Sequence, residues 1–150
     1  LGGYNGGYKS TVYKAAFDIS GNIGTFNTAS QIQLPQLLAD HTTVSAIIGG
    51  TSYVYVLGGS NGSAIQSTVY KATIDTSGNI GTFSTVSQGQ LPRIISNHTT
   101  VVTTIGLSSY IYVLAHILAR SATLNKSCFI IHAVNIPATF RMASYIQDIS

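Results

Sequence analysis

The sequence predicts an all-β fold of tandem four-stranded antiparallel units, followed by a carboxyl-terminal tail that is irregular or weakly helical. Three observations support this fold class: an internal repeat, strand-like patterns within each period, and no helical period in residues 1–114. Charged residues make up only 7% of the chain, against roughly 25% in an ordinary soluble domain. Uncharged Ser, Thr, Asn and Gln therefore supply most of the polarity.

The chain repeats itself at an offset of 57 residues. Aligned without gaps, Ser10–Gly59 and Ser67–His116 are identical at 31 of 50 positions. The phrase "LGG" at Leu1 and again at Leu57 extends the match after a change of one residue in length. Two copies this similar are expected to share one local structure.

Each period contains four segments with the character of strands. They lie at residues 98–105, 110–114, 67–75 and 81–87. The first is β-branched nearly throughout, which predicts a strand buried on both faces. In the third, alternation places Tyr70, Ala72 and Ile74 on one face. Between the last two segments, Gly78 and Asn79 tolerate the positive φ of a hairpin turn.

A four-stranded unit of this length, repeated in tandem, is typical of a β-propeller blade. The phrases "YVYVLGG", "STVY", "GTF" and "LP", in that order, resemble a kelch-type repeat, and most of all the bacterial kelch-like repeats. The resemblance covers residues 1–114, with Phe in place of the usual Trp and with Gln36 where the second copy has Arg93. It implies a structural motif formed by Gly2, Gly3, Gly58, Gly59, Tyr13, Tyr70, Phe26, Phe83, His41 and His98.

This reading divides the chain at Leu114. Residues 1–114 hold two kelch-like repeats, with one full blade from His41 to Leu91 flanked by two half blades, and residues 115–150 form a tail outside the repeat. Closed propellers typically have 4–8 blades, so we expect an incomplete propeller that needs further blades or other copies to close a ring. The tail is either a cap on the last blade or an out-of-frame continuation of the repeat.

The sequence offers little material for catalysis or for binding a metal or cofactor, and we expect none of these. It has four acidic residues, all Asp, so paired-carboxylate chemistry has few candidates. His41 and His98 occupy equivalent positions in different repeats, which favours a structural hydrogen bond at the start of a strand. Asp18 and Asp75 lack the further oxygen ligands of a calcium loop, so we interpret them as caps of their turns.

The function predicted from the sequence is that of a non-catalytic binding or structural module, which presents loops to a protein or glycan partner. Candidate loop residues are Asn61, Ser63 and Arg93. Two alternatives stay open: a fragment of a propeller enzyme that acts on a sugar, with its catalytic residues in missing blades, or a nonfunctional truncated or frameshifted remnant.

Charge and hydropathy narrow the possible partners. The seven Lys and Arg residues are scattered, which argues against nucleic acid as a partner. No apolar run approaches the roughly 18 residues of a membrane-spanning helix. Cys128 is the single cysteine, so no internal disulfide forms. An extracellular or cell-surface location is favoured.

Overall fold

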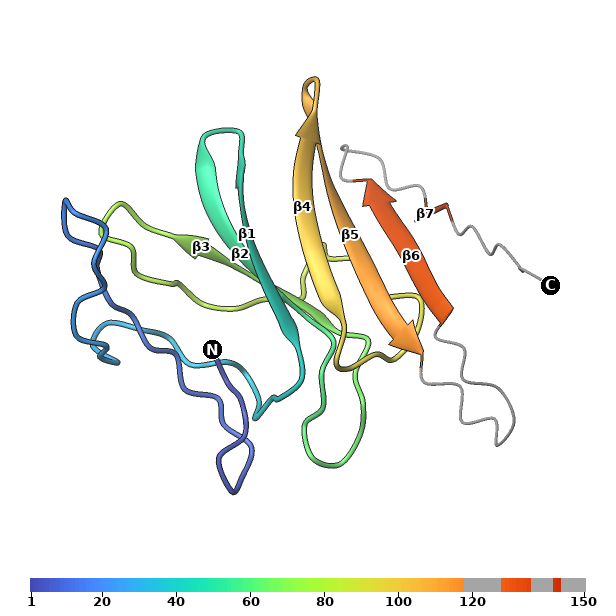
Figure 1. The fold of residues 1–150 in the computed structure, drawn as a ribbon, viewed down its shortest axis with the longest axis horizontal. Coiled ribbons are helices and arrows are strands. Elements are labelled where there is room, and N and C mark those ends of the chain that lie inside the picture. Colours follow the sequence, from blue (N-terminus) through green and yellow to red (C-terminus); the bar gives the residue numbers. More distant parts are fainter. Residues whose placement is uncertain (118–127, 136–141, 144–150) are drawn as a thin grey trace.

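The computed structural model describes residues 1–117, 128–135 and 142–143, and every regular element in that part of the chain is a β-strand. The all-β class predicted from the sequence is therefore confirmed. Figure 1 shows two twisted sheets side by side, with the amino-terminal residues 1–38 on the other side of the first sheet.

The first sheet has three antiparallel strands in the order β1-β2-β3. These are β1 (Thr42–Ile48), β2 (Thr51–Leu57) and β3 (Val69–Ile74). Gly49 and Gly50 join β1 to β2 with φ angles of 59° and 80°. Glycine reaches such positive φ without steric cost, which allows a tight turn between the paired strands.

The second sheet has the order β4-β5-β6-β7, again antiparallel throughout. Its strands are β4 (Thr99–Ile105), β5 (Ser108–Ile117), β6 (Cys128–Asn135) and β7 (Met142–Ala143). The first strands of the two sheets, β1 and β4, lie next to each other (Figure 1). Strands β4 and β5 begin 57 residues after β1 and β2, so the two strand pairs are repeat equivalents.

The tail departs from its prediction where the structure describes it. Residues 128–135 form β6 along the edge of β5, so the expected irregular or weakly helical tail is wrong for this segment. Its sequence, rich in aromatic and β-branched residues, suits a strand once an edge is available for pairing. β5 also continues past Leu114, whereas β2 ends before Gly58, which turns the chain with a φ of 59°. The rest of the tail prediction, at 118–127, 136–141 and 144–150, lies outside the described residues.

The fourth predicted strand of the unit, residues 81–87, is not a regular strand. It follows β3 only through isolated bridges, which join Lys71 to Ser84 and Ile74 to Ile80. Between them, Gly81 N–H donates to Thr73 O at 2.9 Å. This segment therefore runs beside β3 without a continuous ladder.

The two sequence copies make the same backbone hydrogen bonds. Matched N–H to C=O pairs are Gly2 to Thr11 and Gly58 to Thr68, Leu34 to Ser10 and Leu91 to Ser67, and Lys14 to Asn27 and Lys71 to Ser84. Each of these three bonds of the first copy recurs in the second, and all six lengths are 2.8–3.0 Å. The two similar sequences therefore share these local backbone contacts, as the repeat predicted.

Two apolar cores hold successive units together. We define the first unit as residues 1–38, the second as residues 42–95 and the third as residues 99–117. The first core joins the first and second units through Val12, Leu34, Leu38, Val54, Val56, Ala72 and Phe83. The second core joins the second and third units through Tyr55, Leu57, Leu91, Ile111 and Val113.

The strand buried on both faces is β2 and not the one predicted. In β2, Val54 and Val56 point into the first core, whereas Tyr55 and Leu57 point into the second. The segment that begins at His98 was expected to be buried on both faces, but β4 alternates between exposed and half-buried positions. β4 lies at the edge of its sheet, so only its inner face meets the second core.

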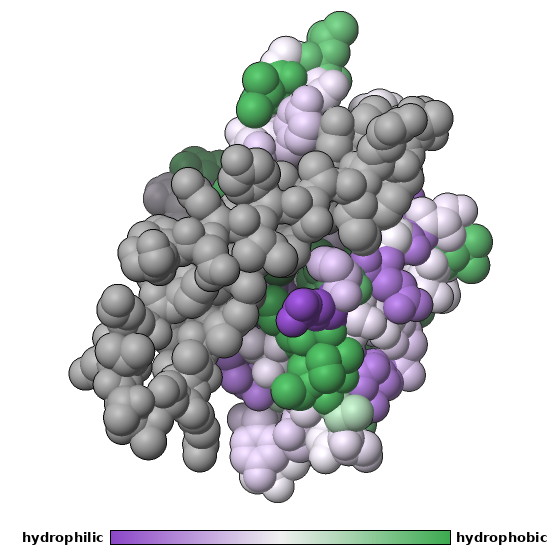
Figure 2. Space-filling model, turned by 90° about the vertical axis from the view of Figure 1, so that its right-hand side faces the viewer, coloured by the Kyte–Doolittle hydropathy of each residue, from purple (hydrophilic) through white to green (hydrophobic). Residues whose placement is uncertain are grey.

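Residues of intermediate hydropathy make up most of the coloured surface on the side of the second sheet (Figure 2). In Figure 2, the coloured residues on the side of the second sheet are mostly pale, with small green and purple areas. Ser, Thr and Gly, which have intermediate hydropathy, make up a third of the chain, whereas charged side chains make up 7%.

Candidate functional site

Two loops meet at one end of the sheets and form what we call the rim, residues 3–9 and 59–66. Figure 1 shows both loops at the lower end of the molecule. A side-chain carbon placed on Gly62 would lie 3.0 Å from the ring of Tyr8, so the two loops are in contact. Equivalent loops of successive units therefore lie side by side, as expected for stacked repeats.

The first rim loop presents a pair of tyrosines. The rings of Tyr4 and Tyr8 pack edge to face, with centroids 5.3 Å apart and an interplanar angle of 76°. Tyr4 is 66% exposed. An exposed aromatic face with a hydroxyl at one end can both stack on an apolar surface and hydrogen-bond.

The second rim loop is held by Asn61. Its side-chain oxygen accepts hydrogen bonds from Ser63 N–H at 3.0 Å and Ala64 N–H at 2.9 Å, while its amide donates to Gln36 Oε1 at 3.3 Å. Asn61, predicted as a binding residue, therefore shapes its own loop. Ser63 is exposed at the tip of that loop.

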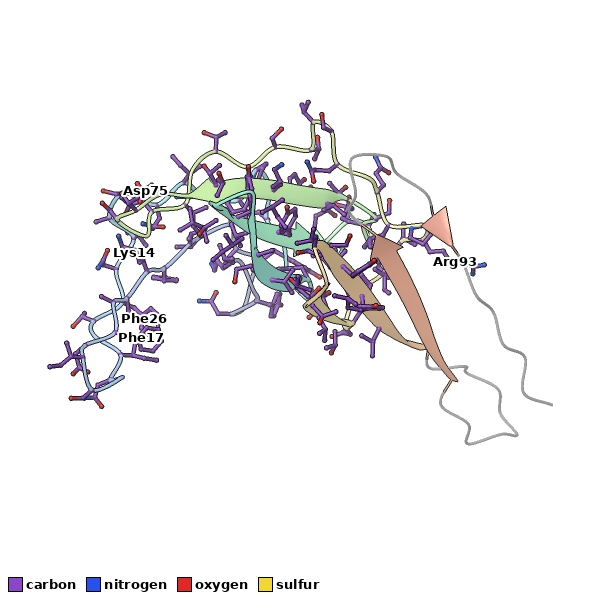
Figure 3. The ribbon with its side chains drawn as sticks, turned by 90° about the horizontal axis from the view of Figure 1, so that it is seen from above. Lys14, Phe17, Phe26, Asp75 and Arg93 are labelled. Carbon is purple, nitrogen blue, oxygen red and sulfur yellow. The ribbon has the colours of Figure 1, made fainter. Side chains whose placement is uncertain are left out.

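Arg93, the third predicted loop residue, is exposed. Figure 3 shows its side chain pointing outward, at the opposite end of the view from Lys14 and Asp75.

The double glycines of the two repeats are required by their backbone. All four have positive φ, at 59° and 105° for Gly2 and Gly3 and at 59° and 91° for Gly58 and Gly59. A Cβ on Gly58 would lie 2.6 Å from Ile95 O, closer than real Cβ atoms come to backbone oxygen. These positions fix the exit from the strand and the approach of the next segment.

The two predicted histidines pack against these glycines. A Cβ on Gly2 would meet His41 Cε1 at 2.9 Å, and one on Gly58 would meet His98 Cε1 at 3.0 Å. His98 is 7% exposed, and its Nε2 lies 2.9 Å from Thr42 Oγ1 in the neighbouring sheet. Thr42 in turn shares a short hydrogen bond with the Thr100 hydroxyl.

Burial lowers the pKa of both imidazoles, and the charge of His41 lowers the pKa of His98 further. The Nδ1 atoms of both rings are buried and have no hydrogen-bond partner in the described part of the chain. Both rings pack on a glycine pair, and His98 also shares a hydrogen bond with Thr42, which agrees with a structural role for His98.

The predicted aromatic positions behave differently in the two copies. Phe83 is 6% exposed in the first core, and Tyr70 packs against that core. Their counterparts Phe26 and Tyr13 are 61% and 59% exposed. The difference lies in the neighbours, because the core around Tyr70 and Phe83 includes residues of the first unit and of strand β2, and residues 1–38 contain no strand equivalent to β2.

Both Asp turns are capped as predicted. Asp18 Oδ1 accepts the N–H groups of Ser20 and Asn22, and its Oδ2 accepts the Asn22 side-chain amide. Asp75 makes the same set of bonds with Ser77 and Asn79. The side-chain amide of Asn22 and the backbone N–H of Asn79 are the main causes that lower the pKa of the two carboxyl groups.

Sequence reasoning missed a polar contact between units. Lys14 Nζ donates to Asn79 Oδ1 at 2.5 Å and to Ser77 O at 3.2 Å. Gln31 donates to the same Asn79 oxygen at 3.2 Å and accepts Ile80 N–H at 3.2 Å. The signal was present in the repeat, because a Lys, a Gln and the "D-x-S-G-N" turn recur together in both copies.

Neither a metal site nor a membrane-crossing helix is found where the structure is described. In those segments, no three metal-binding side chains come together. None of their elements is a helix of the length and hydropathy needed to cross a bilayer. Compared with known protein families, curated proteins and solved structures, the chain matched none.

Proposed function

We propose that residues 1–114 are part of a kelch-like β-propeller that serves as a non-catalytic binding module, with the rim as its binding surface. The stacking of sheets through two similar cores supports the propeller arrangement. In this proposal residues 81–87 are the loosely paired outer strand of a four-stranded blade.

The rim tyrosines carry the proposal of binding. Tyr4 and Tyr8 place aromatic surface beside the polar loop that Asn61 holds in shape. Sugars offer both an apolar ring face and hydroxyl groups, so a glycan fits a surface that combines exposed aromatic rings with amide and hydroxyl groups. We therefore propose a glycan as the partner.

A glycan array probed with the full chain tests this proposal. We expect retention on one class of glycan, and the variant Tyr4→Ala should lower the affinity about tenfold, the loss of about 1.4 kcal/mol expected for one stacked aromatic ring. Tyr13→Ala is the matched control, because Tyr13 is 59% exposed but lies outside the rim. No retention on any glycan, or equal retention by Tyr4→Ala, would contradict the proposal.

A further inference from the structure

The first unit exposes an apolar face that the second unit buries. Tyr13, Phe17, Ile23 and Phe26 are 59%, 70%, 57% and 61% exposed. Their repeat equivalents all belong to or pack against the first core: Tyr70, Ile74, Ile80 and Phe83. In Figure 3, Phe17 and Phe26 lie side by side on the hairpin of the first unit. We call the four exposed residues and the adjoining Asp18 turn the open face.

The second unit shows what covers this kind of face. Its four equivalents belong to or pack against the first core, to which the first unit contributes Val12, Leu34 and Leu38 and strand β2 contributes Val54 and Val56. Beside that apolar contact, Lys14 and Gln31 bind the Asp75 turn through Asn79. Figure 3 shows Lys14 close to Asp75, where the two units meet. The covering surface is thus a leucine-rich patch flanked by one lysine and one glutamine.

The open face also carries the polar turn that corresponds to the Asp75 turn in this contact. The Asp18 turn has the same internal hydrogen bonds as the Asp75 turn, so its shape is already set. An open hollow of about 270 Å³ lies there, lined by Ala16, Phe17, Asp18, Asn22, Ile23 and Gly24. These positions are one repeat before residues 73–81, the segment onto which Lys14 and Gln31 dock.

We propose that the open face docks one further copy of the same repeat, joined in tandem, which supplies the equivalents of Leu34, Leu38, Lys14 and Gln31. Its lysine and glutamine would enter the hollow at Asn22, and its leucines would cover Phe17 and Phe26. A second molecule of this chain does not fit as well. Its own leucine-rich patch is already occupied by its second unit.

This inference rests on the stacked-repeat part of the proposed function and is independent of binding at the rim. The test is a tandem chain in which residues 1–56 are placed before Leu1. The new Val56–Leu1 junction reproduces the natural Val56–Leu57 junction, so the added copy meets the open face in the register of the natural contact.

The readout is the rate at which a thiol-specific reagent labels the variant Phe26→Cys, in a background with Cys128→Ser. In the tandem chain, the cysteine replaces the Phe26 that follows the new junction, and the added copy keeps its own Phe26. We expect labelling in the tandem chain to be slower than in the natural chain by about tenfold or more, because the thiol must wait for a local opening. Amide hydrogen exchange over residues 16–24 should slow in parallel in the tandem chain without the Phe26 substitution. That measurement keeps the test valid if Phe26→Cys weakens the contact.

Two control positions give the labelling rates of a covered and of an exposed cysteine. Phe83→Cys in the natural chain marks the rate of a covered site, since Phe83 is 6% exposed. Ile19→Cys should react rapidly in both chains, because Ile19 is fully exposed and its equivalent Thr76 is exposed beside the existing contact.

Equal labelling and equal amide exchange in the natural and tandem chains would overturn the inference. So would a dimer of the natural chain in which Phe26→Cys is protected, because the face would then be self-complementary. Glycan retention by the same two chains reports on the rim separately, so failure of the docking and failure of the binding proposal are distinguishable.

Discussion

Truncating one aromatic residue in each copy tests whether the contact between units, and not the local sequence, sets stability. Phe83 and Phe26 occupy the same repeat position, but Phe83 is 6% exposed and Phe26 is 61% exposed. Phe83→Ala removes a buried ring from the first core and leaves a cavity, which costs about 3–5 kcal/mol of unfolding free energy. Phe26→Ala removes a ring that keeps less than half of its area from water and leaves no closed cavity, so about 1 kcal/mol is expected.

Urea denaturation followed by circular dichroism measures both losses. We expect the midpoint to fall far more for Phe83→Ala than for Phe26→Ala, with similar slopes of unfolding free energy against urea. Equal losses in the two variants would refute the reasoning, because they would mean that the two copies are packed alike.

Three further outcomes follow from the contacts between repeats. Gly58→Ala should lower the unfolding free energy by more than about 2 kcal/mol, because the new Cβ adds a clash with Ile95 O to the strain of a positive φ. Gly49 has the same φ of 59° but open space around it, so Gly49→Ala should cost only about 1 kcal/mol. Urea denaturation measures both losses. Asn79→Ala should lower the unfolding free energy by about 1 kcal/mol more than Asn22→Ala does, because Asn79 and not Asn22 accepts hydrogen bonds from Lys14 and Gln31. Thermal melts of the two variants test this difference. Burial lowers the pKa of His98 below 6.5, so the unfolded chain binds a proton more readily, and stability should fall as the pH drops below about 6.5 toward the lowered pKa of the folded chain. His98→Asn should show a shallower decline in unfolding free energy over that range, and an unchanged slope would contradict the role of burial at His98.

The sequence predicted the parts of the fold that depend on local pattern. The repeat established that the two copies share a backbone, and the positions of Tyr70, Ala72 and Ile74 predicted one face of β3, all of which pack in or against the first core. Double glycines and Asp-capped turns are also local, because positive φ and a side-chain cap involve only neighbouring residues.

Features that depend on contacts between units could not be predicted from the local sequence pattern. Phe26 and Phe83 stand in the same "GTF" phrase, yet their burial differs because the second unit has both a covering unit and strand β2, whereas residues 1–38 contain no strand equivalent to β2. The β-branched run of β4 suggested burial on both faces, but its position at the sheet edge leaves alternate residues exposed. At the candidate site, Asn61 was identified from its loop, whereas the contact between the loops at Tyr8 and Gly62 required the three-dimensional arrangement.

Tail residues illustrate a second limit of local pattern. The sequence of β6 fits neither the repeat nor a clear strand period, and it forms a strand because the edge of β5 is available to it. Pairing of this kind is a property of the partner as much as of the segment.

The stacking of successive units across the first core is the central claim, and nuclear Overhauser effects test it most directly. In an isotope-edited spectrum of the full chain, we expect cross-peaks between the Phe83 ring protons and the methyl groups of Leu34 and Leu38. Phe83 cross-peaks confined to its own unit, with none to either leucine, would contradict the stacked arrangement.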